Sequence, residues 1–163
     1  MDAQGAERAR PYVEAAEATF KTVVDAQNQL GDLYGFKAIP NGFLIDAAGV
    51  VRYKRLSGFD VRRPETREVV ENWAAGAELG AAEQAQAATG PSDAEAGALF
   101  REGLALYRVG DVVGAMALWR KGMEMDPDNY IIRKQIWAVE NPERFYHGDV
   151  DYAWQREQRA AEQ

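Results

Sequence analysis

The hydrophobic and polar positions of the chain follow two different periods, and each period predicts one kind of element. The consecutive apolar residues Phe43–Ile45 indicate a strand that is covered on both faces. Val51–Lys54 alternates apolar and basic residues, as a half-exposed edge strand does. Between these runs, the Asp46-Ala-Ala-Gly49 sequence is typical of a tight turn, because Asp caps the turn amides and Gly tolerates a left-handed conformation. The pattern therefore predicts a β-hairpin.

The residues before the hairpin are predicted to form a helix, a short strand and a second helix. Apolar residues at helical spacing surround Pro11, which we expect in the first turn of the first helix or at a kink. Phe20–Val24 is predicted to be the short strand. Asp25 is placed to cap a second helix that runs to Tyr34 and is ended by Gly35.

After the hairpin, a further helix and a linker are predicted. Residues 80–91 are rich in Ala, Gln and Gly, which is typical of a linker. Before the linker, Pro64 suits the first position of a helix. The predicted buried stripe of that helix consists of Val69, Val70, Trp73 and Ala77.

Residues 92–154 predict an all-α module. Ser92 and Glu95 form a capping-box signature at its start. Residues 96–129 resemble one tetratricopeptide repeat, in which two helices pack as a hairpin. Glu102 departs from the repeat pattern at a usually apolar position, which predicts a less buried face. The positions that carry the resemblance are Gly103, Gly110-Asp111, Ala115, Trp119, Gly122 and Pro127.

A single repeat cannot bury its own hydrophobic face, so further helices must cover it. Tyr130–Val139 is predicted as the next helix, stopped by Pro142. The aromatic residues that follow are expected to pack mainly in the core. Residues 155–163 are polar and are predicted to be a fraying tail.

The N-terminal segment, residues 1–79, resembles the C-terminal half of a thioredoxin-like redoxin domain. The resemblance is carried by Tyr34-Gly35, Ile39-Pro40, the FLID strand and Gly49, in that order. In that family the proline is cis and lies beside the active-site cysteines, and the preceding residue pairs with an extended substrate peptide. The resemblance therefore implies a peptide- or substrate-binding segment at Ile39, Pro40 and Asn41, although the family usually has Thr in place of Asn41.

The chain contains no cysteine, so it carries no thiol nucleophile, disulfide or thiolate metal ligand. The resemblance implies that a complete relative obtains its catalytic cysteines from a segment upstream. Whether Met1 is a true start or an internal methionine of a longer protein is left open by the sequence. We expect no catalytic residue and no cofactor in this chain.

The net charge of −7 and the pI of about 4.8 disfavour nucleic acid and anionic membranes as partners. No apolar run suits a membrane span or a signal sequence, so a cytoplasmic location is the default expectation. One local exception to the negative charge surrounds Asp60, and a solvated edge strand explains it best. This basic cluster consists of Arg52, Lys54, Arg55, Arg62 and Arg63.

His147 is the only histidine, and with Asp149 and Asp151 it offers too few ligands for a convincing metal site. Metal or hydrolytic chemistry at His147 therefore ranks last among the hypotheses for function.

These observations predict a partial α/β thioredoxin-like fold joined to an all-α tetratricopeptide-like helical hairpin. The first hypothesis is a redoxin-family protein, related to thiol-disulfide or peroxide reductases, whose cysteine-free chain serves in binding or within a longer redox protein. The alternative is a non-catalytic adaptor that binds a partner through the helices, at Tyr107 and Trp119. Expected partners are a protein or an extended peptide, and self-association through a strand edge is a further possibility.

Overall fold

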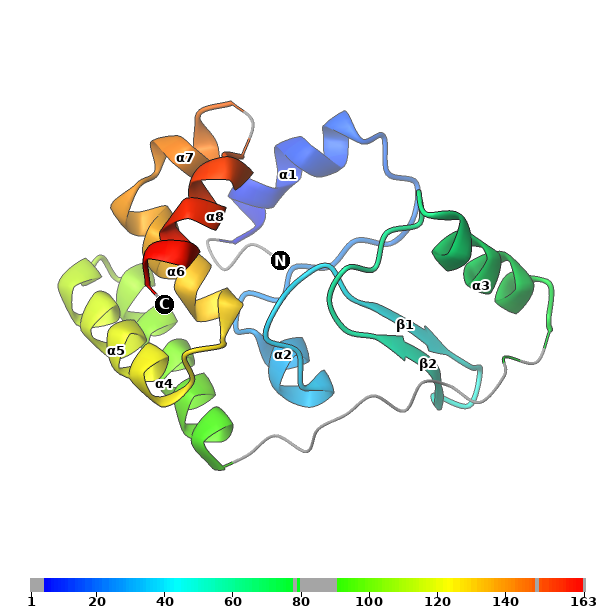
Figure 1. The fold of residues 1–163 in the computed structure, drawn as a ribbon, viewed down its shortest axis with the longest axis horizontal. Coiled ribbons are helices and arrows are strands. Elements are labelled where there is room, and N and C mark those ends of the chain that lie inside the picture. Colours follow the sequence, from blue (N-terminus) through cyan, green and yellow to red (C-terminus); the bar gives the residue numbers. More distant parts are fainter. Residues whose placement is uncertain (1–4, 78, 80–90, 149, 163) are drawn as a thin grey trace.

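The protein combines a small β-hairpin with a larger set of helices (Figure 1). The structure is a computed structural model that describes residues 5–77, 79, 91–148 and 150–162. Among these residues the sheet has two antiparallel strands, which agrees with the expected layout of a part with a β-hairpin followed by an all-helical part. Below, the described residues before residue 80 are called the hairpin half, and those from residue 91 onward are called the helical half. The elements are α1 (Ala6–Ala15), α2 (Gln29–Tyr34), β1 (Gly42–Ile45), β2 (Val51–Arg55), α3 (Pro64–Ala74), α4 (Pro91–Arg108), α5 (Val112–Met125), α6 (Tyr130–Glu140), α7 (Glu143–Tyr146) and α8 (Tyr152–Ala161).

The hairpin forms at the predicted place and by the predicted turn chemistry. Asp46 Oδ1 accepts hydrogen bonds from the amides of Ala48 and Val50, both at 2.9 Å. Gly49 closes the turn with a φ of +81°, a conformation that glycine adopts without steric cost. The predicted β-hairpin is therefore confirmed.

The prediction that β1 is covered on both faces is wrong. Phe43 and Leu44 are half-buried, and Ile45 is 42% exposed. Phe20–Val24, predicted as a strand, has no strand structure, and Phe20 is 75% exposed. The two errors have one cause, because a central strand is buried only when further strands flank it. The described residues supply β1 with β2 alone as a neighbour.

The helix α2 begins and ends where its capping residues predict. The carboxylate of Asp25 accepts hydrogen bonds from the amides of Gln29 at 2.9 Å and Leu30 at 2.7 Å, which caps α2 as predicted. Gly35 ends α2 with a φ of +69°. Pro11 lies in the interior of α1 and not in its first turn, which was the first of the two positions expected for it.

Helix α3 begins at Pro64, as the sequence predicts. Its side chains Val69, Val70 and Trp73 are half-buried, whereas Ala77 is exposed and lies beyond the end of the helix. The predicted stripe is therefore confirmed for three of its four members, and α3 is shorter than predicted.

The core of the protein lies between α4 and α5, around Trp119. The Trp119 side chain is fully buried, and its indole N–H donates a hydrogen bond to the carbonyl of Phe100 at 3.1 Å. Gly103 on α4 faces this ring so closely that a Cβ atom there would lie 2.3 Å from Trp119 Nε1. The predicted helical hairpin is therefore formed, with Ala115 fully buried at the same contact. Glu102 is exposed, as its departure from the repeat pattern predicts.

The prediction of a fraying polar tail is wrong. Residues 152–161 form α8, and Asp151 caps it by accepting a hydrogen bond from the amide of Trp154 at 2.9 Å. Trp154 packs edge-to-face on Trp137, with 5.6 Å between the ring centroids, and Gln155 is buried. One aromatic anchor and one cap hold a segment whose composition is otherwise polar.

Residues 25–39 fasten the hairpin half to the helices. Lys37 Nζ lies 2.9 Å from Asp126 Oδ1, and the Asp126 side chain is only 5% exposed. The amide of Ile131 donates to the carbonyl of Lys37 at 3.1 Å. Asp32 forms an ion pair with Arg101 of α4. Figure 1 shows α2 between the hairpin and the helical half, in agreement with these contacts.

The predicted linker, residues 80–91, and the capping side chain of Ser92 fall outside the described residues, except that α4 already includes Pro91. Their prediction stays a prediction.

We expect Gly103→Ala to destabilise the protein by about 1–3 kcal/mol, because the added methyl group overpacks the indole of Trp119. Ala favours a helix more than Gly does, so a purely local effect would have the opposite sign. Urea unfolding measures the change. In a Trp119→Phe background the same substitution should cost clearly less. An equal cost in both backgrounds would contradict the proposed contact.

We expect Lys37→Met to destabilise the protein by about 2 kcal/mol, because it leaves the buried carboxylate of Asp126 without its ammonium partner. The additional change Asp126→Asn should recover much of this loss, since it removes the unpaired charge. Arg10→Met is a matched control, because its ion pair with Glu7 is exposed and such pairs contribute little. Equal unfolding midpoints for the Lys37 and Arg10 variants would contradict the role of this contact.

Candidate functional site

The segment around Pro40 is a bend at the entrance of β1. The Ile39–Pro40 peptide bond is cis, as the redoxin resemblance implies. The side chain of Asn41 holds the bend, donating from Nδ2 to the carbonyl of Ala38 at 2.6 Å and accepting from the amide of Ser57 at 2.7 Å. Asn41 therefore ties the start of β1 to the loop after β2.

An apolar groove lies beside this bend, between α1, residues 22–25, α2 and the start of β1. It encloses about 540 Å³. Several of its apolar side chains are strongly exposed, including Val23 at 72% and Tyr12 at 59%. Ile39 reaches it from the bend and is 42% exposed. Phe43 of β1 forms part of the wall and packs on Tyr34, with 4.4 Å between the ring centroids.

The groove adjoins an incompletely paired strand. β1 pairs only with β2 among the described residues, with Gly42 opposite Arg55 and a register shift between Leu44 and Ile45. A strand with one neighbour presents backbone donors and acceptors on its other edge, and these groups accept a further strand. The structure therefore brings together Ile39, Pro40 and Asn41, the unpaired edge of β1 and an exposed apolar groove.

The two residues predicted to contact a partner on the helical half have different surroundings. Trp119 is fully buried, so it offers no accessible surface to a partner. Tyr107 is half-buried and packs against Trp119, with 5.6 Å between the ring centroids. Both side chains contribute to the core of the helical hairpin.

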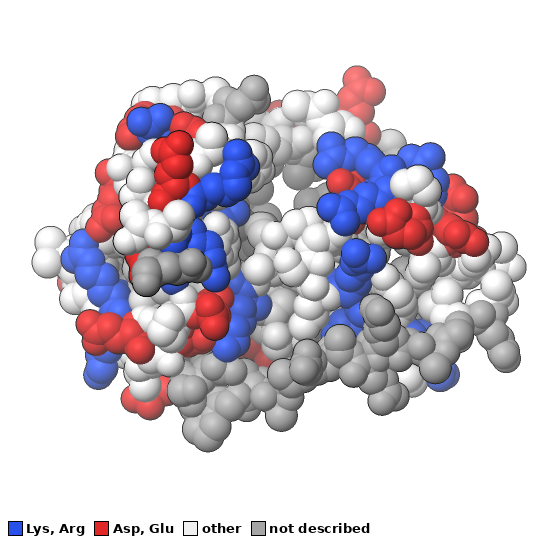
Figure 2. Space-filling view, in the orientation of Figure 1, with Lys and Arg blue, Asp and Glu red and all other residues white. Residues whose placement is uncertain are grey.

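The basic cluster is held partly by neighbouring carboxylates. Arg62 donates to Asp60 at 2.8 Å, and this hydrogen bond lowers the pKa of Asp60 to about 2. Arg52 pairs with Asp46 of the turn at 2.7 Å. Figure 2 shows Lys and Arg side chains gathered on the side of the molecule that carries the hairpin and α3. These contacts fit a solvated edge strand.

Metal and membrane sites find no support in the described part of the chain. There, no three His, Cys, Asp or Glu side chains gather in an arrangement that holds a metal ion. His147 is exposed, and Asp149 lies outside the described residues. No helix among the described residues is both long and apolar enough to cross a bilayer.

A second, more enclosed pocket was not foreseen from the sequence. It lies between residues 25–39 and the helices α4, α6 and α7, and its volume is about 150 Å³. Its polar side chains are Asp25, Asn28, Lys134, Gln135, Tyr130 and Tyr146. They come from distant parts of the chain, so no local motif marks them. The sequence signals them only through the polar run Arg133-Lys134-Gln135, which interrupts the apolar residues of the predicted helix.

Comparison with known proteins gives no relative from which a function follows: no family model, no curated protein and no solved structure matches this chain.

Proposed function

We propose that this chain is the thiol-free part of a redoxin-type protein and that it binds an extended polypeptide segment along the unpaired edge of β1. The observation that carries the proposal is the position of this edge beside an exposed apolar groove. In this role the chain does not itself carry the redox chemistry, which needs a thiolate from the bound polypeptide or from another part of a longer protein.

The unpaired edge of β1 suits the main chain of an added strand, and the groove suits its side chains. A strand that is added to a sheet gains main-chain hydrogen bonds along its length, and alternate side chains enter the pockets beside it. Here the bend at Ile39 and Pro40 sets where pairing begins. The exposed side chains of Val23 and Tyr12 provide apolar surface for the inward-facing residues of the added strand. The favoured partner is therefore an extended segment with alternating apolar residues.

A second candidate function is adaptor binding through the helical half. Three valines are exposed at the turn between α4 and α5, and Val109 and Val113 are 79% and 83% exposed. Val112, at 40% exposure, completes this patch. Exposed apolar patches are typical of surfaces that bind another protein. Unlike these exposed valines, Trp119 is fully buried and Tyr107 is half-buried against it.

We expect a labelled hexapeptide of alternating Thr and Val to bind the chain, with the binding followed by fluorescence anisotropy. Val23→Asp should weaken this binding about tenfold, because it places a carboxylate in the apolar groove, where removal from water is costly. Hydrogen exchange should show new protection of the amides of Phe43–Ile45 in the complex.

Val113→Asp is the matched control, since it introduces the same charge at a similarly exposed valine on the helical half. It should leave peptide binding unchanged. A loss of binding with Val113→Asp but not with Val23→Asp would favour the adaptor function. An absence of peptide binding to the unmodified chain would overturn the strand-binding proposal.

We expect the purified chain to turn over neither insulin disulfides nor peroxide, because both reactions need a thiolate and the sequence has none. A standard insulin-reduction assay and a peroxide-consumption assay test this expectation, with an active thioredoxin as positive control. Turnover above the rate of the buffer would contradict it.

A further inference from the structure

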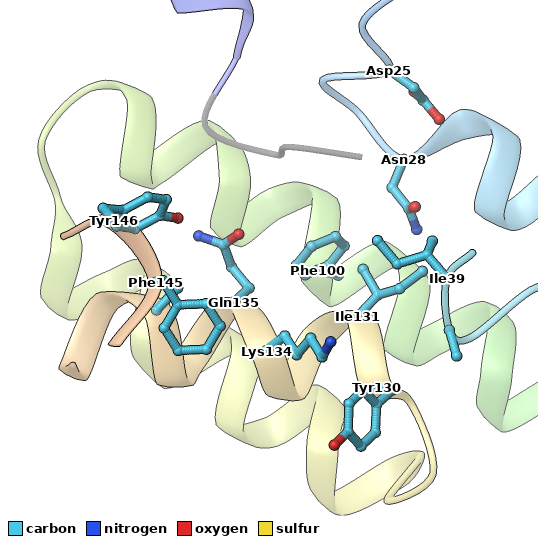
Figure 3. Close-up of a pocket in the computed structure, with 12 residues that line it drawn as sticks. Asp25, Asn28, Ile39, Phe100, Tyr130, Ile131, Lys134, Gln135, Phe145 and Tyr146 are labelled. Atoms are coloured by element: carbon cyan, nitrogen blue, oxygen red, sulfur yellow. The ribbon is translucent and has the colours of Figure 1, made fainter. Parts of the chain in front are cut away.

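The pocket between the two halves has the size and lining of a small-molecule site. Its volume of about 150 Å³ is similar to that of a protein cavity that accepts benzene. Phe100 of α4, Ile131 of α6, Phe145 of α7 and Ile39 of the bend give it apolar walls. Figure 3 shows these side chains around a common space. An apolar body about the size of one aromatic ring fits such a volume.

The Lys134 side chain brings an ammonium group into this pocket. The ammonium lies 5.1 Å from the centre of the Tyr130 ring and 5.8 Å from that of Tyr152. Among the described residues, no carboxylate lies within ion-pair distance of it. Asp25 also lines the pocket, but its carboxylate is engaged by the amides at the start of α2. Burial lowers the pKa of Lys134, as expected for an ammonium removed from water without an anion beside it.

Gln135 presents an unsatisfied donor to the same pocket. Its side chain is 8% exposed, and its Nε2 atom is buried without a hydrogen-bond partner in the described structure. Figure 3 shows the amide of Gln135 pointing toward Tyr146, whereas the ammonium of Lys134 points toward Tyr130. Buried polar groups without partners cost free energy, so each of these groups favours a ligand that completes it.

We propose that this pocket binds a small aromatic carboxylate that carries a hydroxyl group at the end opposite its carboxylate. The carboxylate pairs with the Lys134 ammonium, and the ring occupies the space between Phe100, Ile131 and Phe145. A hydroxyl oxygen accepts hydrogen bonds, so at the far end of the ligand it pairs with the unsatisfied donor Gln135 Nε2. This inference goes beyond the strand-binding proposal and rests on a different cavity.

The ligand also contacts both halves of the protein. Ile39, Asn28 and Asp25 line the pocket from the hairpin half, whereas Lys134 and Gln135 line it from α6. A bound ligand therefore stabilises the docking of residues 25–39 on the helices. Because it binds the folded state alone, it should raise the melting temperature, and the rise should keep growing with the logarithm of the ligand concentration above the dissociation constant.

Isothermal titration calorimetry of the full chain with three related compounds tests the proposal. We expect 4-hydroxyphenylacetate to bind most tightly. Replacing its carboxylate, as in 2-(4-hydroxyphenyl)ethanol, should weaken binding about tenfold or more, because a charge-assisted hydrogen bond is lost. Removing the hydroxyl, as in phenylacetate, should weaken binding about fivefold, because a neutral hydrogen bond contributes less. Equal affinities for the three compounds, or no binding of any, would overturn the proposal.

Two substitutions test which pocket residue binds the carboxylate and which binds the hydroxyl of the ligand. Lys134→Met keeps the apolar stem and should abolish the preference for a carboxylate. Gln135→Leu should abolish the preference for a hydroxyl while leaving the protein folded, because it removes an unsatisfied buried amide. Lys121→Met, at an exposed lysine of α5, is the charge-matched control and should bind like the unmodified chain.

Circular dichroism and the melting temperature without ligand check the fold of each variant. Unchanged preferences in both folded pocket variants would refute the assignment. Val23→Asp, which lies outside this pocket, should leave carboxylate binding intact, so failure of strand binding and failure of ligand binding are distinguishable.

Discussion

The structure depends on the docking of residues 25–39 against the helical half. A two-stranded sheet cannot shield its own apolar residues, and a hairpin of this size is marginal in water without a packing partner. Here Phe43 of β1 packs on Tyr34 of α2. Residues 25–39 in turn reach the helical half through the ion pair of Lys37 with Asp126 and the hydrogen bond from the amide of Ile131 to the carbonyl of Lys37. The helical half has its own core around Trp119, so support passes from the helices to the hairpin.

The parts of the fold that the sequence predicts well are those fixed by neighbouring residues. The hairpin turn follows from Asp46 and Gly49, the cap of α2 from Asp25, and the start of α3 from Pro64. Local chemistry decides these three features, and it is visible in the sequence. The resemblance to a helical repeat also placed Gly103 where two helices approach closely, but that Gly103 lies against the ring of Trp119 is seen only in the structure.

The features that escaped prediction depend on what lies opposite each residue in space. Phe20–Val24 has the composition of a strand, but a strand forms only where a neighbour offers hydrogen bonds. Helix α8 is polar in composition, and the packing of Trp154 on Trp137 holds it in place. Asn28 and Gln135 come from opposite halves of the chain and line one pocket. No spacing rule connects residues from two separate halves.

Ile39 forms part of the wall of both the open groove and the enclosed pocket. A side chain shared by two cavities cannot move for one occupant without reshaping the space left to the other. An occupant of one cavity that displaces Ile39 therefore changes the affinity of the other cavity for its own occupant, and by reciprocity the effect is mutual. The bend before Pro40 thus lies at the boundary of both candidate binding sites.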